Sequence, residues 1–321
     1  MAGRHPICTL LYVTMFGLLG CSSARDMTDF RDTYDWGDLS RVPHRPSPEQ
    51  RFQARDGTML LYRSYGGQSP IDLILVHGSG SDSVYLSLLA TRIASSDIVR
   101  VWTPDVRGHG PSPQRRGDID YIDQLEDDLA DLSAWIRSMN PRGILILGGH
   151  SSGGGLVIRF AGGSYRGTAD GYLLLAPFLQ HDAPTLRPQV GGWATPKTSR
   201  IVALNVLNAM GIRRLNGLTT IEFNLPLARR NGDETLSYSY RLMTGFNPRN
   251  YESDLGALEE PTLVVVGTDD ESFYAEEFPG VFGAFTPHAQ VELIPDAKHL
   301  GLVVEAVVPP LVVEWLERSV L

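Results

Sequence analysis

The sequence predicts an α/β fold, with a mostly parallel central sheet, helices on both faces and one inserted segment. Three observations predict it. Between residues 52 and 177, short apolar runs typical of buried strands alternate with stretches of helical periodicity. The alternation stops at residues 178–255 and resumes afterwards. Finally, the Gly- and Ser-rich stretch at residues 148–155 lies between two apolar runs, as a tight turn from a strand into a helix would.

The first half of the core begins with a predicted β-hairpin, because Asp56-Gly57 separates two short strand-like runs. The runs at 71–76 and 98–102 are almost entirely apolar, as expected for strands covered on both faces. The helix at 119–139 has its apolar residues on one stripe and acids opposite. The expected strands are 52–55, 59–65, 71–76, 98–102, 144–147 and 172–175, and the expected helices are 83–93, 119–139 and 156–161.

The inserted segment, residues 178–255, contains no strand pattern as strong as those before it. Helical spacing recurs at 199–210 and 234–243, between stretches rich in Gly, Pro and Asn. A bare loop of this length is uncommon inside a compact domain. We therefore expect a mostly helical lid that covers part of the core.

The core resumes after the lid, so it is expected to comprise residues 50–177 and 256–321. Pro309-Pro310 is expected to break the last helical region, because proline lacks the N–H that a helix interior requires. The elements expected here are a strand at 263–266, a helix around 273–285, a strand at 291–294 and a fresh helix at 311–318.

The composition is that of an ordinary globular protein of 321 residues with a net charge of −9. No basic run or basic-aromatic cluster is present, which disfavours nucleic acid as a partner. No spaced group of His, Cys and Asp suggests a metal site. We expect neither a metal nor a cofactor.

The N-terminal segment has the pattern of a secretory signal peptide. Arg4 precedes an apolar run at residues 7–19, which is too short to span a bilayer comfortably. The run ends in Leu-Leu-Gly-Cys, which resembles the bacterial lipobox; this implies removal of residues 1–20 and lipidation of Cys21. An ordinary signal peptide with an incidental cysteine is the alternative. The resemblance implies a lipid-anchored protein of the bacterial cell envelope, and Ser22 favours the outer membrane.

Residues 21–49 are polar and contain Pro43, Pro46 and Pro48 close together, as semi-extended linkers do. Acids recur there at every third position, with aromatic residues between them and no evident cage of ligands. We expect a solvated tether. The acids noted at this spacing are Asp29, Asp32, Asp35 and Asp38.

Three candidate catalytic side chains follow strands of the predicted sheet. Ser151 is the serine of a G-x-S-x-G turn, where a positive φ would project its hydroxyl into a cleft. Asp269 and Asp270 follow the strand at 263–266, and His299 follows the strand at 291–294. Reactive groups of open α/β sheets gather at this edge, so these side chains are expected to meet.

At these residues the chain resembles an α/β-hydrolase, most closely the branch of monoacylglycerol lipases, lysophospholipases and serine aminopeptidase-like enzymes. Together with Ser151 and His299, the motifs that carry the resemblance are His77-Gly-Ser-Gly, Asp105-Val-Arg-Gly-His-Gly-Pro-Ser, the G-x-S-x-G turn and Gly267-Thr-Asp-Asp. The resemblance implies an α/β-hydrolase fold and a serine hydrolase. It also implies that His77, Asp105 and His109 shape loops rather than perform chemistry.

The resemblance assigns roles to the candidate residues. Ser151 is the nucleophile, His299 takes its proton, and the acid of the family lies three residues after Gly267, which selects Asp270 over Asp269. The backbone amides of Ser79 and Ser152 are expected to donate to the oxyanion.

We therefore expect carboxylic ester hydrolysis by an exported enzyme held at a membrane by its lipid. An apolar lid surface that faced Ser151 would suit an acyl chain, although the same residues would equally pack the lid onto the core. The lid residues concerned are Trp193, Leu204, Leu207, Met210, Leu215, Phe223, Leu225, Tyr238, Tyr240, Met243 and Phe246.

Other activities stay open. An aminopeptidase would need acids to receive the substrate ammonium, and Glu222, Asp233 and Glu234 are available in the lid. Acyl transfer to an acceptor other than water would use the same triad. A non-catalytic binding protein of this fold is a further hypothesis, from another functional class.

Overall fold

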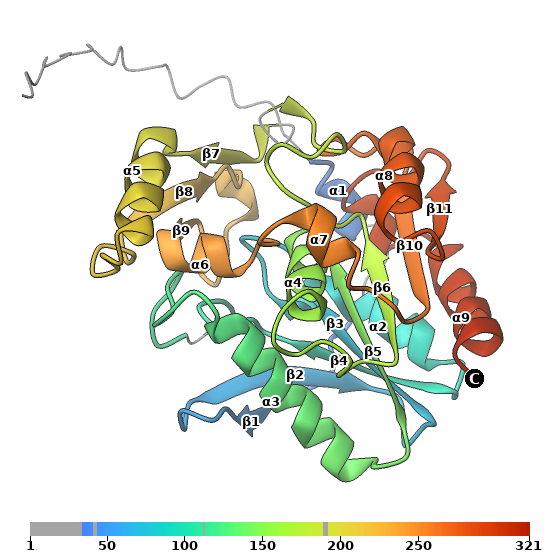
Figure 1. Ribbon diagram of the computed structural model, residues 1–321. Helices are drawn as coiled ribbons and strands as arrows, with labels where there is room; N and C mark the ends of the chain where they lie inside the picture. The colour runs from blue at the N-terminus through green and yellow to red at the C-terminus, as the bar shows by residue number, and fades with distance from the viewer. Residues whose placement is uncertain (1–33, 41–43, 112, 189–191) are drawn as a thin grey trace, which may run out of the picture. The chain divides into compact units, whose positions relative to one another are not determined.

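The computed structural model of the chain describes residues 34–40, 44–111, 113–188 and 192–321 (Figure 1). The expected signal segment and Cys21 lie outside the described residues. Within these described ranges, no helix is long and apolar enough to cross a membrane.

The predicted α/β fold is confirmed, with an eight-stranded sheet in the order β1-β2-β4-β3-β5-β6-β10-β11 (Figure 1). The β1–β2 hairpin and the β2–β4 pair are antiparallel, and the other neighbours are parallel. Strands β3, β6 and β10 are buried along their whole length, because both faces of the sheet are covered. The strands are β1 (Gln50–Gln53), β2 (Met59–Tyr65), β3 (Ile71–Val76), β4 (Val99–Pro104), β5 (Ile144–His150), β6 (Gly171–Leu175), β10 (Thr262–Gly267) and β11 (Gln290–Ile294).

The strand order also determines which face each helix covers. The chain moves one way along the sheet from β3 to β4 and the opposite way from β4 onward, and right-handed crossovers then put α2 and α3 on opposite faces. Helices α2 and α9 pack together, and α4 packs against α3 and α7. The helices and helical turns of the core are η1 (Ser83–Leu86), α2 (Ser87–Ala94), α3 (Gln124–Met139), α4 (Ser152–Ala161), η4 (Ala275–Glu277), α8 (Phe278–Phe285), η5 (Gly301–Val303) and α9 (Val308–Ser319).

Several helix boundaries differ from the sequence prediction, and two of the differences have a clear physical reason. Helix α3 begins at Gln124 rather than at residue 119, since the residues before it form turns. Pro309 and Pro310 do not end a helix but lie in the first turn of α9. Proline is tolerated there because the first amides of a helix have no intrahelical acceptor.

The insertion holds more helix than strand, as predicted for the lid, but it also contains a three-stranded antiparallel sheet, β7-β8-β9, which the sequence analysis did not predict. The helical pattern expected at 234–243 divides into a strand and a short helix. These strands are three to five residues long, too short for a clear period of two to appear in the sequence. The elements of the insertion are β7 (Ala194–Pro196), α5 (Thr198–Ala209), β8 (Thr219–Phe223), η3 (Leu227–Arg229), β9 (Ser237–Ser239), α6 (Tyr240–Gly245) and α7 (Tyr251–Leu255).

The predicted tether is wrong in part. Residues 34–40 pack on the core, and they include the short helix α1 (Gly37–Ser40). Tyr34 and Asp38 are only 4% and 2% exposed. The sequence shows acids alternating with aromatic residues here. Whether such aromatic rings are buried depends on their packing against distant parts of the chain, which this local pattern does not contain.

A buried ion-pair network joins the end of the insertion to the core. Glu126 of α3 accepts hydrogen bonds from Arg159 of α4 at 2.7 Å and from Arg249 at 2.6 Å. Glu126 and Arg159 are 1% and 2% exposed. Removing one partner of such a pair leaves a buried charge uncompensated.

We predict that Glu126→Gln, which keeps the side-chain volume, lowers the free energy of unfolding by about 3–5 kcal/mol. The matched control is Asp131→Asn, whose partner Arg55 has a 45% exposed side chain and whose loss should cost about 1 kcal/mol or less. Urea unfolding of the two variants measures the difference. Equal losses would contradict the role given to the buried network.

Candidate active site

Ser151 occupies a strained turn between β5 and α4, with φ 56° and ψ −123°. Two glycines permit the turn. A Cβ on Gly149 would lie 2.3 Å from the carbonyl carbon of Gly153, and a Cβ on Gly153 would lie 2.3 Å from the carbonyl oxygen of Val76. The positive φ at a non-glycine residue places the serine at the tip of the turn, beside a cavity that its side chain lines.

His299 and Asp270 form a buried pair in the loops that follow β11 and β10. The Nδ1 of His299 lies 2.7 Å from Oδ2 of Asp270. The other oxygen of Asp270 accepts from the amides of Ser272 at 2.8 Å and Phe273 at 2.9 Å. The two side chains are 2% and 1% exposed, whereas Asp269 points to solvent. The structure thus brings Asp270, and not its neighbour, to the imidazole.

Ser151 and His299 line the same small cavity, of about 20 Å³. Within the described part of the chain, their side chains are not hydrogen-bonded to one another. Such bonds are commonly long or poorly aligned in a ligand-free site and tighten when substrate binds. The turn therefore presents the hydroxyl to the same space that the imidazole faces.

The loop after β3 presents a backbone donor to this space. The amide of Gly78 donates to the hydroxyl of Tyr85 at 2.7 Å, and the amide of Gly80 donates to the hydroxyl of Tyr238 at 2.7 Å. The amide of Ser79, between them, has no acceptor among the described residues, and neither has that of Ser152 at the start of α4. Both serines line a cavity beside Ser151. Two tyrosines thus fix the peptides on either side of the expected oxyanion donor.

Tyr85 also connects this loop to His299. Its hydroxyl lies 2.9 Å from Nδ1 of His150, and Nε2 of His150 lies 3.1 Å from the carbonyl oxygen of His299. Burial, and then the neighbouring His299, hold the pKa of His150 well below its usual value. A neutral His150 with its proton on Nε2 satisfies both contacts, donating to the carbonyl and accepting from Tyr85. Sequence analysis did not identify Tyr85, because it lies in a stretch that was expected to be a regular helix.

Tyr238 comes from the insertion and contacts a second histidine. Its hydroxyl lies 2.6 Å from Nε2 of His109, whose Nδ1 faces the carbonyl oxygen of Val106 at 3.1 Å. His77 donates from Nδ1 to the oxygen of Gly78 and accepts at Nε2 from the amide of Val106. Burial lowers the pKa of both histidines. His77 and His109 therefore hold loops together, as the resemblance implied, and Asp105 does so too by accepting from the amide of Ser83 at 2.8 Å.

The chamber, as we call the space at Ser151, consists of the small cavity that Ser151 and His299 line and of a second cavity beside it. The side of the chamber that faces the insertion is apolar. A cavity of about 60 Å³ beside Ser151 is lined mostly by aromatic and aliphatic side chains, several of them from the insertion. Met210 and Leu215, by contrast, are 69% and 40% exposed and lie outside it. Of the lid residues named from the sequence, those that line this cavity are Trp193, Phe223, Tyr238, Met243 and Phe246.

The structure has two larger cavities, and one of them adjoins the chamber. One, of about 600 Å³, includes Asp233 and Glu234, so the structure places two of the three lid acids there. Glu222 instead pairs with Lys197.

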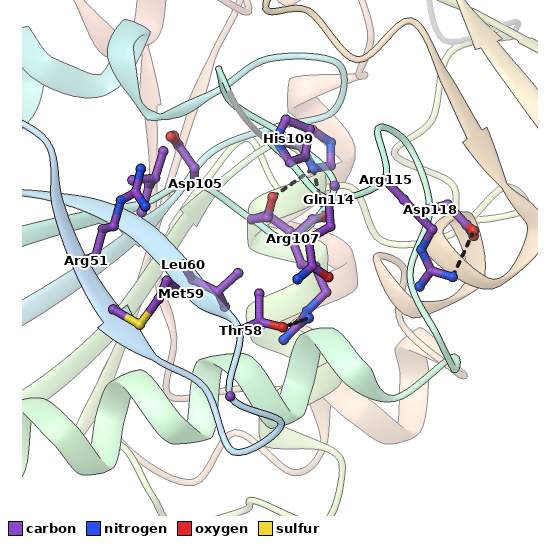
Figure 2. Close-up of a pocket in the computed structure, with 15 residues that line it drawn as sticks. Arg51, Thr58, Met59, Leu60, Asp105, Arg107, His109, Gln114, Arg115 and Asp118 are labelled. Atoms are coloured by element: carbon purple, nitrogen blue, oxygen red, sulfur yellow. Dashed lines mark hydrogen bonds and ion pairs between the residues drawn. The ribbon is translucent and has the colours of Figure 1, made fainter.

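The other larger cavity, of about 370 Å³, lies next to the hairpin β1–β2 (Figure 2). Two of its arginines are paired: Arg115 with Asp118, as Figure 2 shows, and Arg107 with Asp128 at 2.7 Å. Neither Ser151 nor His299 lines it. No group of three or more His, Cys, Asp or Glu residues in the described ranges could hold a metal ion.

A parallel sheet that carries a serine on a strained strand-to-helix turn, with a buried Asp–His pair at the same edge, defines the α/β-hydrolase class. Comparison with known families agrees. The family described as serine aminopeptidase, S33, matches residues 71–303. The chain belongs to this hydrolase family.

Solved structures that the chain resembles include esterases and lipases. A soluble variant of the monoglyceride lipase of Saccharomyces cerevisiae, in complex with a substrate analogue, superposes with a TM-score of 0.62 at 18% identity, over 87% of this chain and 97% of that one. The monoacylglycerol lipase of Paleococcus ferrophilus gives 0.59 at 21%, over 80% and 98%. A thermophilic esterase of Thermogutta terrifontis gives 0.58 at 24%, over 85% and 99%. At these identities the likeness establishes the fold.

A curated relative is a Pseudomonas putida protein, the dihydrolipoyllysine-residue acetyltransferase component of an acetoin cleaving system. It is 27% identical over an alignment of 262 residues that covers 76% of this chain. The chain spans only 62% of that relative's length.

We predict that Tyr85→Phe and Tyr238→Phe each lower kcat about tenfold or more in the ester cleavage expected from the sequence, because a freed loop amide lets the expected oxyanion donor drift from its position. Steady-state kinetics with a p-nitrophenyl ester measures the effect. Tyr65→Phe is the matched control, since it removes a buried hydroxyl that contacts Ser87 at 2.8 Å and lies in β2. A loss of kcat as large in the control would contradict the prediction.

Proposed function

We propose that this chain is a serine hydrolase that cleaves carboxylic esters, with Ser151, His299 and Asp270 as its triad. The observation that carries the proposal is the buried Asp270–His299 contact of 2.7 Å, facing the cavity that the strained Ser151 lines. A serine hydroxyl is too weak a nucleophile without an adjacent base, and the imidazole supplies one.

In the proposed mechanism the Ser151 hydroxyl attacks the ester carbonyl while Nε2 of His299 takes its proton. Asp270 holds the proton on Nδ1 and stabilises the imidazolium that forms. The amides of Ser79 and Ser152 donate to the oxyanion. His299 then gives the proton to the leaving alcohol, and water, activated by the same imidazole, releases the acyl group from Ser151.

The proposed substrates are esters with an apolar acyl group. The aromatic lining of the cavity beside Ser151 supports this, because an apolar wall contributes binding energy without requiring polar partners. The structural likeness to two monoacylglycerol lipases agrees with it. A cavity of about 60 Å³ holds only a few carbon atoms, so longer chains require the insertion to move.

Aminopeptidase activity is the second candidate, and one observation favours it. Asp233 and Glu234 line the cavity of about 600 Å³ that adjoins the chamber, where they could receive a substrate ammonium. The family description also names serine aminopeptidase. Aminoacyl arylamides tested against p-nitrophenyl esters of increasing chain length would separate the two activities.

We also propose that the chain is exported and anchored to a membrane of the bacterial envelope by lipid on Cys21. The support is the lipobox-like Leu-Leu-Gly-Cys at the end of the apolar run. Twelve residues separate Cys21 from Tyr34. A fully extended chain of that length reaches about 40 Å, so such an anchor would keep the active site close to its membrane.

For the catalytic assignment, we expect fluorophosphonate to label the wild-type protein and not Ser151→Ala. Asp270→Asn should lower kcat by about 10⁴-fold by favouring the wrong imidazole tautomer. Asp269→Asn, a matched change at an exposed neighbour, should stay active. Labelling that persists in Ser151→Ala would exclude Ser151, and an inactive Asp269→Asn would reassign the acid.

For the anchor, we expect metabolically supplied palmitate to label the wild-type protein in bacteria and to be absent from Cys21→Ala. The wild-type protein should sediment with membranes, because two or more acyl chains bind a bilayer stably. Cys8→Ala is the matched control and should keep its label. A labelled Cys21→Ala would refute the proposed site.

A further inference from the structure

Residues 34–40 lie against the proposed catalytic base. The ring of Tyr34 stacks on the imidazole of His299, with centroids 5.0 Å apart and planes 17° from parallel. The Tyr34 hydroxyl contacts the hydroxyl of Ser272 at 2.6 Å, and the amide of Ser272 donates to Asp270. One side chain therefore touches the imidazole face and the turn that holds the acid.

Polar contacts fix this segment beside the same two loops. Asp35 receives Nζ of Lys298 at 2.7 Å, and its amide donates to Glu271 at 3.3 Å. The other carboxylate oxygen of Glu271 accepts from the amide of His299 at 2.9 Å. The residues that hold the segment are thus the immediate neighbours of the proposed acid and base. A segment that merely covered apolar surface would need none of these contacts.

Trp36 extends the contact toward the substrate space. Its ring lies 5.6 Å from that of Trp193, whose indole N–H donates to the Ser79 hydroxyl at 3.0 Å. Trp36 lines both the small cavity that contains Ser151 and the adjoining cavity of about 600 Å³. Its own Nε1 is buried and has no hydrogen-bond partner in the described part of the chain.

We propose that residues 34–40 belong to the active site. In this proposal Tyr34 is a positioning residue for His299, and Trp36 limits the size of the alcohol group that a bound ester can have. This rests on the proposed hydrolase function. Tyr34 covers one face of the imidazole while Asp270 holds its edge, so the ring keeps the orientation that proton transfer requires. An aromatic face also stabilises the positive charge that the imidazole acquires during the reaction.

The choice of Trp36 as the restricting side chain follows from its place between the two cavities. When the acyl group of an ester lies in the apolar cavity, its alcohol group must extend toward the cavity of about 600 Å³. Trp36 and Trp193 stand at that passage, one from the N-terminal segment and one from the insertion. Shortening Trp36 should therefore admit bulkier alcohols, whereas the acyl preference should stay as it is.

The first test compares Tyr34→Ala with Tyr34→Phe in the full chain. Tyr34→Ala should lower kcat for a short ester about tenfold with little change in KM, since proton transfer and not binding is impaired. Tyr34→Phe keeps the stacked ring and should restore most of kcat. Tyr165→Ala is the matched control, because that tyrosine stacks on Phe160 at the far end of α4 from Ser151. A normal kcat in Tyr34→Ala, or no rescue by Phe, would overturn the positioning role.

A second readout does not depend on turnover. In the Ser151→Ala background, Tyr34→Ala should speed amide hydrogen exchange in residues 297–303, which include His299, while Tyr165→Ala should not. Unchanged exchange there would overturn the proposal even if the chain cleaved no ester. An inactive wild-type protein with the expected exchange would instead count against the hydrolase function alone.

The restricting role is tested with esters of one acyl group and increasingly bulky alcohols. Trp36→Ala should raise kcat/KM for the bulkiest alcohol relative to the smallest by about tenfold, and Trp36→Phe should do so much less. The order of acyl-chain preference should be unchanged. An unaltered alcohol preference in Trp36→Ala would remove Trp36 from the substrate path.

Discussion

The site depends on the hydrogen bond between Asp270 and His299, which are 1% and 2% exposed. In water such a contact would exchange with solvent, but here two backbone amides hold the second oxygen of the carboxylate. Parallel strands β10 and β11 are neighbours, so their following loops meet at one edge of the sheet. The fold therefore creates the pair before any substrate arrives, and preorganisation of this kind costs nothing during the reaction.

Three structural regions converge on that pair. The core supplies the strained turn of Ser151, the insertion supplies Tyr238 and Trp193, and the N-terminal segment supplies Tyr34. Hydroxyl groups of Tyr85 and Tyr238 satisfy the amides on each side of Ser79. The hydrogen bonds among these contacts satisfy buried polar groups that would otherwise be costly, and all of the contacts together orient the groups that line the chamber.

Because residues 34–36 contact both the cavity at Ser151 and the loops of Asp270 and His299, substrate access depends on the position of this N-terminal segment. Tyr34 and Trp36 line the chamber, and Asp35 contacts the loops of the proposed acid and base. If Cys21 carries lipid as proposed, the segment that forms one wall of the site is also the one that leads toward the membrane. Opening of the chamber and approach to a lipid surface would then involve the same residues.

The amino-acid sequence was enough to predict the sheet, the order of its strands along the chain and the serine turn, because apolar runs and glycine spacing are local signals. It also indicated Asp270 and His299, through a family pattern. The contacts that surround Ser151, Asp270 and His299 became known only from the tertiary structure. Tyr85, Tyr238 and Tyr34 make these contacts across the fold, and no local sequence pattern predicts them. The short strands of the insertion and the packing of residues 34–40 escaped prediction for the same reason, since their burial depends on surfaces far away in the sequence.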